Sequence, residues 1–314
     1  MSKAGLVFDE RVILHDPGDG HPESPERVRV LRRVFQDASI KDRLPRIHSR
    51  MATGDDLRQV HTKHYMDVVR HDLHRKSRTL STGDTGLNEH SETSALAAAG
   101  ATLAAVDAVF QTPLKRAFAA VRPPGHHATA SRGMGFCIFN NAALAARYAR
   151  KAHGVDRVLI ADWDVHHGNG TQDIFYADPA VFFFSTHQWP WYPGTGAPDE
   201  TGEGAGKGLT MNCPFPAGSG RAEILGAFRK KLMPAMDDFK PGLVIVSAGF
   251  DSRRGDPLGK FTLTDGDFRE LTELMLEIAG KHAGGRLVSV LEGGYSMEGL
   301  ARAVKAHVQT LMEA

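Results

Sequence analysis

Cysteine is scarce in this chain: two of the 314 residues, Cys137 and Cys213, carry a thiol. Two cysteines cannot form the disulfide framework that stabilises small secreted domains, so the fold must depend on a hydrophobic core. A chain of this length can bury a large core without such help. Because free thiols persist in reducing compartments, we expect a cytoplasmic protein.

The sequence also lacks a run of 18 apolar residues, and its first residues lack the basic-then-apolar pattern of a signal peptide. An excess of either charge is missing too, since 38 Lys and Arg face 37 Asp and Glu, for a net charge of +1. We therefore expect no membrane span and no non-specific binding of nucleic acid. Neither a linker rich in Pro and Ser nor an internal repeat divides the chain, so we expect a single domain over residues 1–314.

Short apolar runs rich in β-branched and aromatic residues recur along the chain and predict buried strands. The runs lie at residues 5–8, 117–121, 157–161, 180–187, 209–213, 242–248 and 286–291. Helical patterns separate them, among them an alanine-rich stretch from Ser91 to about Phe110. Because the runs do not alternate with polar residues, both faces of the sheet must be covered. The sequence therefore predicts an α/β fold of three layers, with a mainly parallel central sheet between helices.

Local signals place some helix ends. Asn140 and Gly154 bound one helix, Thr264 caps another, and Pro234 is expected to kink or end a third. The histidines within residues 53–75 have no carboxylate partner in the sequence pattern, and we expect all of them on the surface. They are His61, His64, His71 and His74.

Residues that bind metals follow two of the predicted strands. Asp164 and His166 lie two apart after the strand at 157–161, so their side chains point the same way, and Asp251 follows the strand at 242–248. The carboxyl ends of parallel strands meet at one edge of a sheet, where ligands bind. Two carboxylates and one imidazole suit Zn²⁺ or Fe²⁺ and leave an open coordination position. An isolated D-x-H is usually only a turn, but here further polar residues gather at the same edge.

Those further residues are two histidines and a tyrosine. The rigid sequence Arg122-Pro123-Pro124-Gly125 presents His126 and His127 at the end of a strand, and Gly293-Gly294 precedes Tyr295 at the end of another. A metal would polarise a carbonyl and acidify a water. One histidine would take the proton of that water, a protonated imidazole would hand a proton to a leaving amine, and the phenol would bind the oxyanion. This set predicts amide hydrolysis without an acyl-enzyme.

These motifs, in this order, resemble the histone deacetylase family and its arginase–deacetylase fold. The resemblance covers nearly the whole chain and implies one deacetylase catalytic domain over 1–314, with its active site at the carboxyl ends of the strands. The matching motifs are His21-Pro22-Glu23, Pro123 to His127, Asp162 to Gly170, Pro193 to Gly196, Asp251, and Glu292 to Tyr295.

The resemblance also implies a role for each matching residue. The zinc ligands fall on Asp164, His166 and Asp251, and the catalytic residues on His126, His127 and Tyr295, with Asp162 orienting the first histidine. Asp162 and Ser185 match residues that hold a structural potassium ion. Phe136 and Tyr192 match the walls of an acyl-lysine tunnel, Leu258 matches its rim, and Gly135 and Gly294 adjoin it. Arg27 matches an arginine behind the metal.

Asn169 departs from class I members of the family, which have Asp there, and resembles class II and bacterial relatives. An amide does not raise the basicity of His127 as a carboxylate would. We therefore expect His127 to be the general base, and His126, beside Asp162, to remain cationic and to act electrostatically or as an acid.

Three alternatives to a lysine deacylase follow from the same residues. An arginase-type binuclear hydrolase needs carboxylates where this chain has Gly168 and Arg253, which disfavours it. An acetylpolyamine amidohydrolase is the live alternative: Leu258 favours acyl-lysine peptides, but Asp84 and Glu89 would suit an ammonium group. A non-catalytic binding protein on this fold would have lost a ligand or Tyr295. Relatives of this kind also lead us to expect a homo-oligomer.

Overall fold

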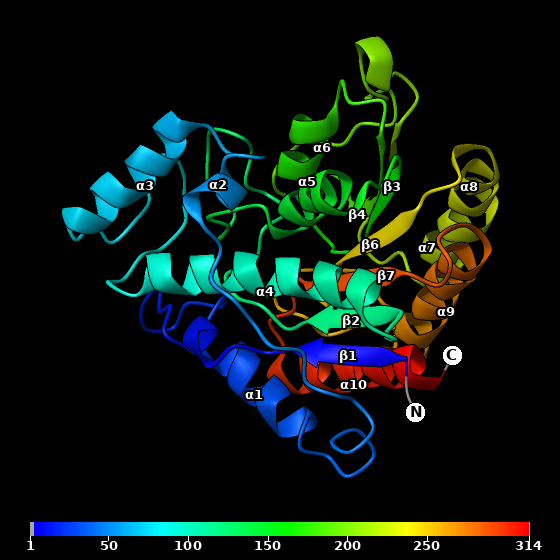
Figure 1. Ribbon diagram of the computed structural model, residues 1–314. Coiled ribbons are helices and arrows are strands. Elements are labelled where there is room, and N and C mark those ends of the chain that lie inside the picture. Colours follow the sequence, from blue (N-terminus) through cyan, green and yellow to red (C-terminus); the bar gives the residue numbers. More distant parts are fainter. Residues whose placement is uncertain (1–2, 314) are drawn as a thin grey trace.

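Seven parallel strands form one sheet at the centre of the protein (Figure 1), whose computed structural model describes residues 3–313. The strand order is β1-β2-β7-β6-β3-β4-β5, and every neighbouring pair is parallel. The strands are β1 (Ala4–Val7), β2 (Arg116–Ala119), β3 (Val158–Asp162), β4 (Val181–Gln188), β5 (Thr210–Phe215), β6 (Leu243–Ala248) and β7 (Leu287–Leu291). The predicted strands and the parallel sheet are confirmed.

Helices cover both faces of the sheet, which confirms the three-layer α/β/α fold (Figure 1). α4 (Ser91–Gln111) and α5 (Asn141–His153) lie on one face. α1 (Glu26–Val34), α9 (Asp265–His282) and α10 (Met297–Glu313) lie on the other. With both faces covered, every residue of β3, β4, β6 and β7 is buried, which is why these strands read as continuous apolar runs.

The alanine-rich sequence of α4 follows from its place in the core. Its small side chains let it pack closely against the sheet, and most of its residues are buried. Among the described residues it is the one helix long and apolar enough to cross a membrane, but 78% of its apolar window is buried inside the protein. Its composition is therefore that of a core helix.

The remaining helices are short and flank this framework. They are α2 (Gly54–Leu57), α3 (Lys63–His74), α6 (Asn169–Phe175), α7 (Arg221–Ala227) and α8 (Met233–Phe239). The side chain of Asn140 caps α5, Gly154 ends it at φ 65°, and Thr264 caps α9, as predicted. Pro234 is expected to kink or end a helix, and the regular α-helical pattern is interrupted directly before it: α7 leads into α8 through a π-helical turn at Phe228–Leu232. Proline has no N–H for the i→i−4 hydrogen bond, so an irregular turn at this place agrees with the expectation.

One of the histidines expected on the surface is buried. His61 is 2% exposed: its Nδ1 lies 3.0 Å from the carbonyl oxygen of Thr129, and its Nε2 accepts the N–H of Asn140 at 3.0 Å. Both partners lie far from His61 in the sequence, so local pattern carried no sign of them. The ring is a structural link between the segment that precedes α3 and the start of α5.

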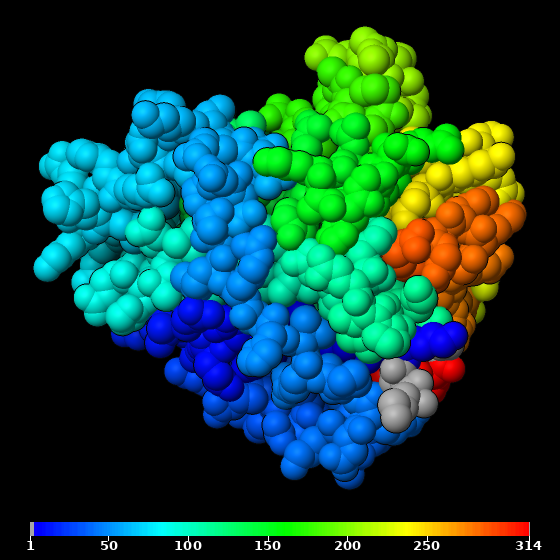
Figure 2. All heavy atoms as spheres, in the orientation of Figure 1, coloured from blue at the N-terminus to red at the C-terminus, as the bar shows by residue number. Residues whose placement is uncertain are grey.

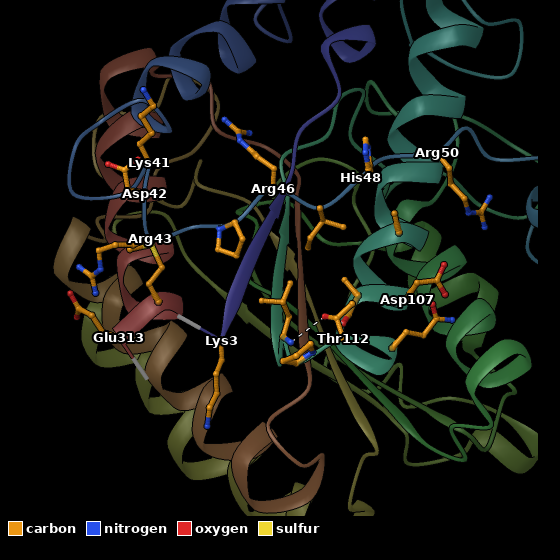
Figure 3. A pocket seen from close by; sticks show the side chains of 18 residues that line it. Lys3, Lys41, Asp42, Arg43, Arg46, His48, Arg50, Asp107, Thr112 and Glu313 are labelled. Carbon is orange, nitrogen blue, oxygen red and sulfur yellow. Dashed lines mark hydrogen bonds between the residues drawn. The ribbon is translucent and has the colours of Figure 1, made fainter. Parts of the chain in front are cut away.

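A hollow of the surface lies at the amino ends of the strands, away from the predicted site. It has a volume of about 1420 Å³ and is lined by segments that precede β1 and β2 and by the end of α10. Lys3, Arg43, Arg46 and Arg50 stand around it (Figure 3). Figure 2 shows the segment after α1 lying across this side of the molecule. No residue that the sequence predicts for the active site lines this hollow.

Candidate active site

A buried cluster of two carboxylates and one imidazole lies just beyond the ends of β3 and β6. Asp164, His166 and Asp251 offer donor atoms that all lie within 4.8 Å of one another, and within residues 3–313 this is the one such group. Nδ1 of His166 lies 3.0 Å from Oδ1 of Asp164 and 3.2 Å from Oδ2 of Asp251. The three residues predicted as metal ligands are therefore brought together.

The electrostatics of this cluster suit a divalent cation. Burial and the negative charge of Asp164 raise the pKa of Asp251 to about 7, whereas His126 and His166 lower the pKa of Asp164 against the effect of its burial. Oδ2 of Asp251 is buried and has no hydrogen-bond donor among the described residues. A cation between the carboxylates would relieve their repulsion and satisfy this oxygen. Two oxygens and one nitrogen fit zinc with an open position.

Main-chain amides fix the outer sides of both carboxylates. The N–H of Gly293 donates to Oδ2 of Asp164 at 2.8 Å, and the N–H of Val165 donates to Oδ1 of Asp251 at 2.8 Å. Such hydrogen bonds orient ligand side chains before a metal binds.

The two adjacent histidines have different partners and different electrostatics. Nδ1 of His126 lies 2.9 Å from Oδ2 of Asp162, whereas Nδ1 of His127 lies 2.7 Å from the amide oxygen of Asn169. Burial alone would lower the pKa of His126, but Asp162 and Asp164 outweigh it and raise that pKa to about 10. Burial lowers the pKa of His127 well below its ordinary value, and the nearby His126 and His166 add to this effect. These opposite directions favour a cationic His126 and a neutral His127.

The ring of His127 is packed against a glycine. Gly135 has φ 56°, and a Cβ there would lie 2.3 Å from Cδ2 of His127. Any side chain at this position would displace the imidazole. The glycine-rich sequence of this loop thus lets the backbone approach the histidine closely.

Tyr295 is held from two sides. Its backbone N–H donates to Oδ2 of Asp256 at 2.7 Å, and the guanidinium of Arg27 lies 4.9 Å from the centre of its ring. Burial raises the pKa of Tyr295 well above its ordinary value, and the charges of Asp251 and Asp164 raise it further although Arg27 opposes them. The phenol therefore keeps its proton and can donate it in a hydrogen bond.

A narrow cavity of about 220 Å³ leads from the surface to this cluster. Its lining residues are Asp84, His127, Gly135, Phe136, His166, Trp191, Tyr192, Leu258 and Tyr295. Aromatic and aliphatic side chains form most of its wall, while His127, His166 and Tyr295 come from the polar cluster. This arrangement suits an extended apolar chain that ends in a polar, reactive group.

Among the other predicted residues, Gly294, Arg27 and Ser185 also lie outside the wall of this cavity. The carbonyl of Gly294 accepts Nε–H of Arg27 at 2.7 Å, so Gly294 lies behind Tyr295. Arg27 is fully buried and forms an ion pair with Glu23 at 3.0 Å. Ser185 on β4 is the register partner of Asp162 on β3, and its hydroxyl lies 2.9 Å from Nδ1 of His187.

Several further groups around the site have no role that the sequence predicted. Asp256 accepts the N–H groups of Tyr295, Ser296 and Leu258, at 2.7, 3.0 and 3.0 Å. Nε1–H of Trp191 donates to the carbonyl of Leu258 at 2.9 Å and so ties two loops at the cavity mouth. Glu292 is fully buried directly after an apolar strand. That isolated charge was the one local sign of its importance.

The chain is similar to known proteins over most of its length. A sequence model of the histone deacetylase domain matches residues 21–311. A probable deacetylase of Archaeoglobus fulgidus is 39% identical over 297 residues, which cover 94% of this chain and 82% of that protein. Histone deacetylase 15 of Arabidopsis thaliana is 38% identical, with 99% of this chain and 57% of that protein covered.

Two further relatives bear on substrate and fold. The polyamine deacetylase HDAC10 of Homo sapiens is 40% identical, with 98% of this chain and 48% of that protein covered. The crystal structure of the HDA15 HD domain matches at a TM-score of 0.93 and 38% identity, covering 99% of this chain and 88% of that chain. This chain therefore spans only about half the length of some of its relatives.

Proposed function

The chain belongs to the histone deacetylase family, and on that basis we propose that it is a zinc-dependent enzyme that hydrolyses the side-chain amide of acyl-lysine. One observation carries the proposal. The Asp164–His166–Asp251 cluster meets His127 and Tyr295 at the inner end of one narrow apolar cavity. An acyl-lysine side chain is an apolar chain that ends in an amide, so it matches the cavity in shape and polarity.

The metal would be held by one oxygen or more of each carboxylate and by the imidazole of His166. A divalent ion held there supplies Lewis-acid polarisation of the amide carbonyl and lowers the pKa of a water molecule towards about 7.

The side chains of the protein then control the protons. Because Nδ1–H of His127 donates to Asn169, its Nε2 is free to accept the proton of the attacking water. His126, cationic beside Asp162, places a positive charge next to the reacting centre. Tyr295 donates a hydrogen bond to the developing oxyanion, and protonated His127 passes its proton to the leaving amine. A His127→Ala variant with near-full activity would refute this division of roles.

Acetylpolyamine hydrolysis is the second candidate, and Asp84 is the observation that favours it. Its carboxylate lines the same cavity and accepts the N–H of Gly135 at 2.6 Å. A carboxylate at this place would attract the ammonium groups of a polyamine. Leu258, an apolar residue on the opposing loop, favours an acyl-lysine peptide instead.

Substrate competition separates the two candidates. Zinc-loaded enzyme would be assayed with an acetyl-lysine peptide and with N-acetylputrescine, and Leu258→Glu would be assayed in parallel. We expect the wild type to prefer the peptide and the variant to move towards the polyamine. If the wild type preferred N-acetylputrescine, acetylpolyamine hydrolysis would replace acyl-lysine hydrolysis as the proposed function. Activity that survives full removal of divalent metal would refute the zinc mechanism.

We further propose a structural potassium ion near Asp162, the last residue of β3, and its register partner Ser185 within β4. The side-chain oxygens of both residues are buried, and such oxygens suit a hard cation. Thermal unfolding in potassium and in tetramethylammonium chloride would test it, with higher stability expected in potassium. A cytoplasmic location is also part of the proposal, since both cysteines are buried and free.

A further inference from the structure

Glu292 reaches from the end of β7 to the turn that carries the two histidines. Its side chain is fully buried, and its Oε2 accepts the N–H of Gly125 at 2.7 Å and the N–H of His126 at 3.1 Å. The residues joined in this way are 167 and 166 positions apart in the chain. One carboxylate oxygen thus satisfies both amides at the tip of the turn.

The opposite side of the same turn is fixed by α6. The carbonyl oxygen of His126 accepts the N–H of Gly170 at 3.0 Å and the N–H of Thr171 at 3.2 Å. The main chain of His126 is therefore held between a carboxylate on its amide side and a helix start on its carbonyl side. Gly125 is packed closely against the start of α5, since a Cβ there would lie 2.5 Å from the backbone nitrogen of Asn141.

Glu292 is itself rigidly placed. Its N–H donates to the carbonyl of Ala248 at the end of β6, at 3.0 Å, and its own carbonyl accepts a hydrogen bond from the buried guanidinium of Arg27. The next residue, Gly293, donates its N–H to Asp164 at 2.8 Å. The segment 292–295 therefore contacts the histidine turn through the side chain of Glu292, and it contacts the proposed metal ligand Asp164 through the amide of Gly293. The same segment ends in Tyr295.

Packing of the core does not by itself account for a buried carboxylate at position 292. Its second oxygen, Oε1, is buried without a hydrogen-bond donor among the described residues. A buried carboxylate with unused acceptor capacity costs stability, and an apolar side chain of similar size would avoid that cost. What an apolar side chain would not supply is an acceptor for the two amides of the turn.

We propose that Glu292 is a positioning residue for the hydrolysis: its carboxylate sets the place of the His126–His127 turn relative to the metal ligands. The inference rests on the proposed function. The hydrogen bonds from Glu292 to the turn depend on the length of its side chain and on the position of its acceptor oxygen. They fix the main chain that carries both imidazoles. Glu292 does not line the substrate cavity. Its loss should therefore reduce kcat and leave KM unchanged, since misplacing a catalytic group by about 1 Å can cost about 100-fold in rate.

Two substitutions of Glu292 separate the effect of side-chain length from the effect of charge. Glu292→Gln keeps the length and one acceptor oxygen but removes the charge, whereas Glu292→Asp keeps the charge and shortens the reach by one methylene. We expect Glu292→Gln to retain kcat within about fivefold, and Glu292→Asp to lose about 10- to 100-fold with KM within twofold. The matched control is Glu298→Gln, which removes an exposed carboxylate of α10, 79% exposed, and should behave as wild type.

The proposal would be overturned if Glu292→Asp were active and Glu292→Gln inactive. Activity would then depend on the charge of residue 292 and not on the length of its side chain. A change confined to KM would overturn it as well. Amide hydrogen exchange of the segment around 125–126 gives a readout that does not need activity. Exchange there should be faster in Glu292→Asp than in wild type and Glu298→Gln, and equal protection would overturn the positioning role. A wild type that is inactive on both substrates would refute the proposed function, while the exchange result would still decide the contact.

Discussion

Replacement of Gly293 by alanine tests whether the Asp164–Asp251 pair is a metal site. Gly293 has no positive φ, so the backbone permits alanine and the effect would be steric. The new Cβ would lie 2.1 Å from Oδ2 of Asp251 and 2.6 Å from Oδ2 of Asp164, whereas real Cβ contacts essentially never fall below 3.0 Å. The carboxylates must therefore move by roughly 0.5–1 Å, several times the tolerance of about 0.2 Å in zinc–ligand distances.

Because second-shell changes alone cost about 10- to 100-fold in metal affinity, we expect this displacement of two ligands to cost at least about 100-fold. Competition with a chromophoric chelator would measure zinc affinity, and kcat would be measured at saturating zinc. Overpacking should also lower the free energy of unfolding by about 1–3 kcal/mol.

The matched control is Gly280→Ala in α9, where a Cβ would meet no atom within 4 Å. It should leave zinc affinity and kcat unchanged and raise the free energy of unfolding by about 0.5–1 kcal/mol, as alanine does in an exposed helix. If Gly293→Ala binds zinc as tightly as Gly280→Ala, the assignment of these carboxylates as metal ligands is wrong.

Three further predictions follow from the site and its surroundings. Tyr295→Phe should lower kcat about 100- to 1000-fold without loss of zinc, measured by steady-state kinetics and metal analysis; a smaller effect would remove the phenol from the mechanism. Asn169→Asp should raise the pKa of His127 and so move the acidic limb of the kcat/KM profile to higher pH, because His127 must be neutral to act as base. Burial lowers the pKa of His307 to about 3 and of His61 to about 4, below the value of about 6.5 in an unfolded chain. Their contribution to stability is therefore complete above about pH 6.5 and is lost as the pH falls towards 4; urea unfolding at pH 7 and pH 5 should show this loss, and His307→Gln should reduce it.

The sequence allowed the strands, the three layers and the grouping of Asp164, His166 and Asp251 to be predicted because each depends on a local pattern. Continuous apolar runs mark strands buried on both faces, and polar residues directly after such runs must gather at one edge of a parallel sheet. Asp164, His166 and Asp251 lie together for this reason. The resemblance to a family then supplied roles that geometry alone left open.

Contacts between distant segments could not be predicted in the same way. The pairing of β3 with β6, whose first residues Val158 and Leu243 are register partners, has no local signature. The burial of His61 depends on residues near position 130 and on α5, and the role of Glu292 depends on a turn 167 residues away. Such contacts follow from the closed fold, and a single sequence shows only that a polar residue stands in apolar surroundings.

In the proposed mechanism, the different partners of the two histidines would give direction to the proton transfer. The rings of His126 and His127 lie 4.0 Å apart and are almost fully buried, so two positive charges there would repel strongly. Asp162 keeps the charge on His126, and Asn169 offers His127 no compensating charge. In the proposed mechanism, a proton that His127 takes from water would therefore lie beside the positive charge of His126 in a site of low dielectric. That repulsion would favour its onward transfer to the leaving amine, which would restore the neutral base for the next turnover.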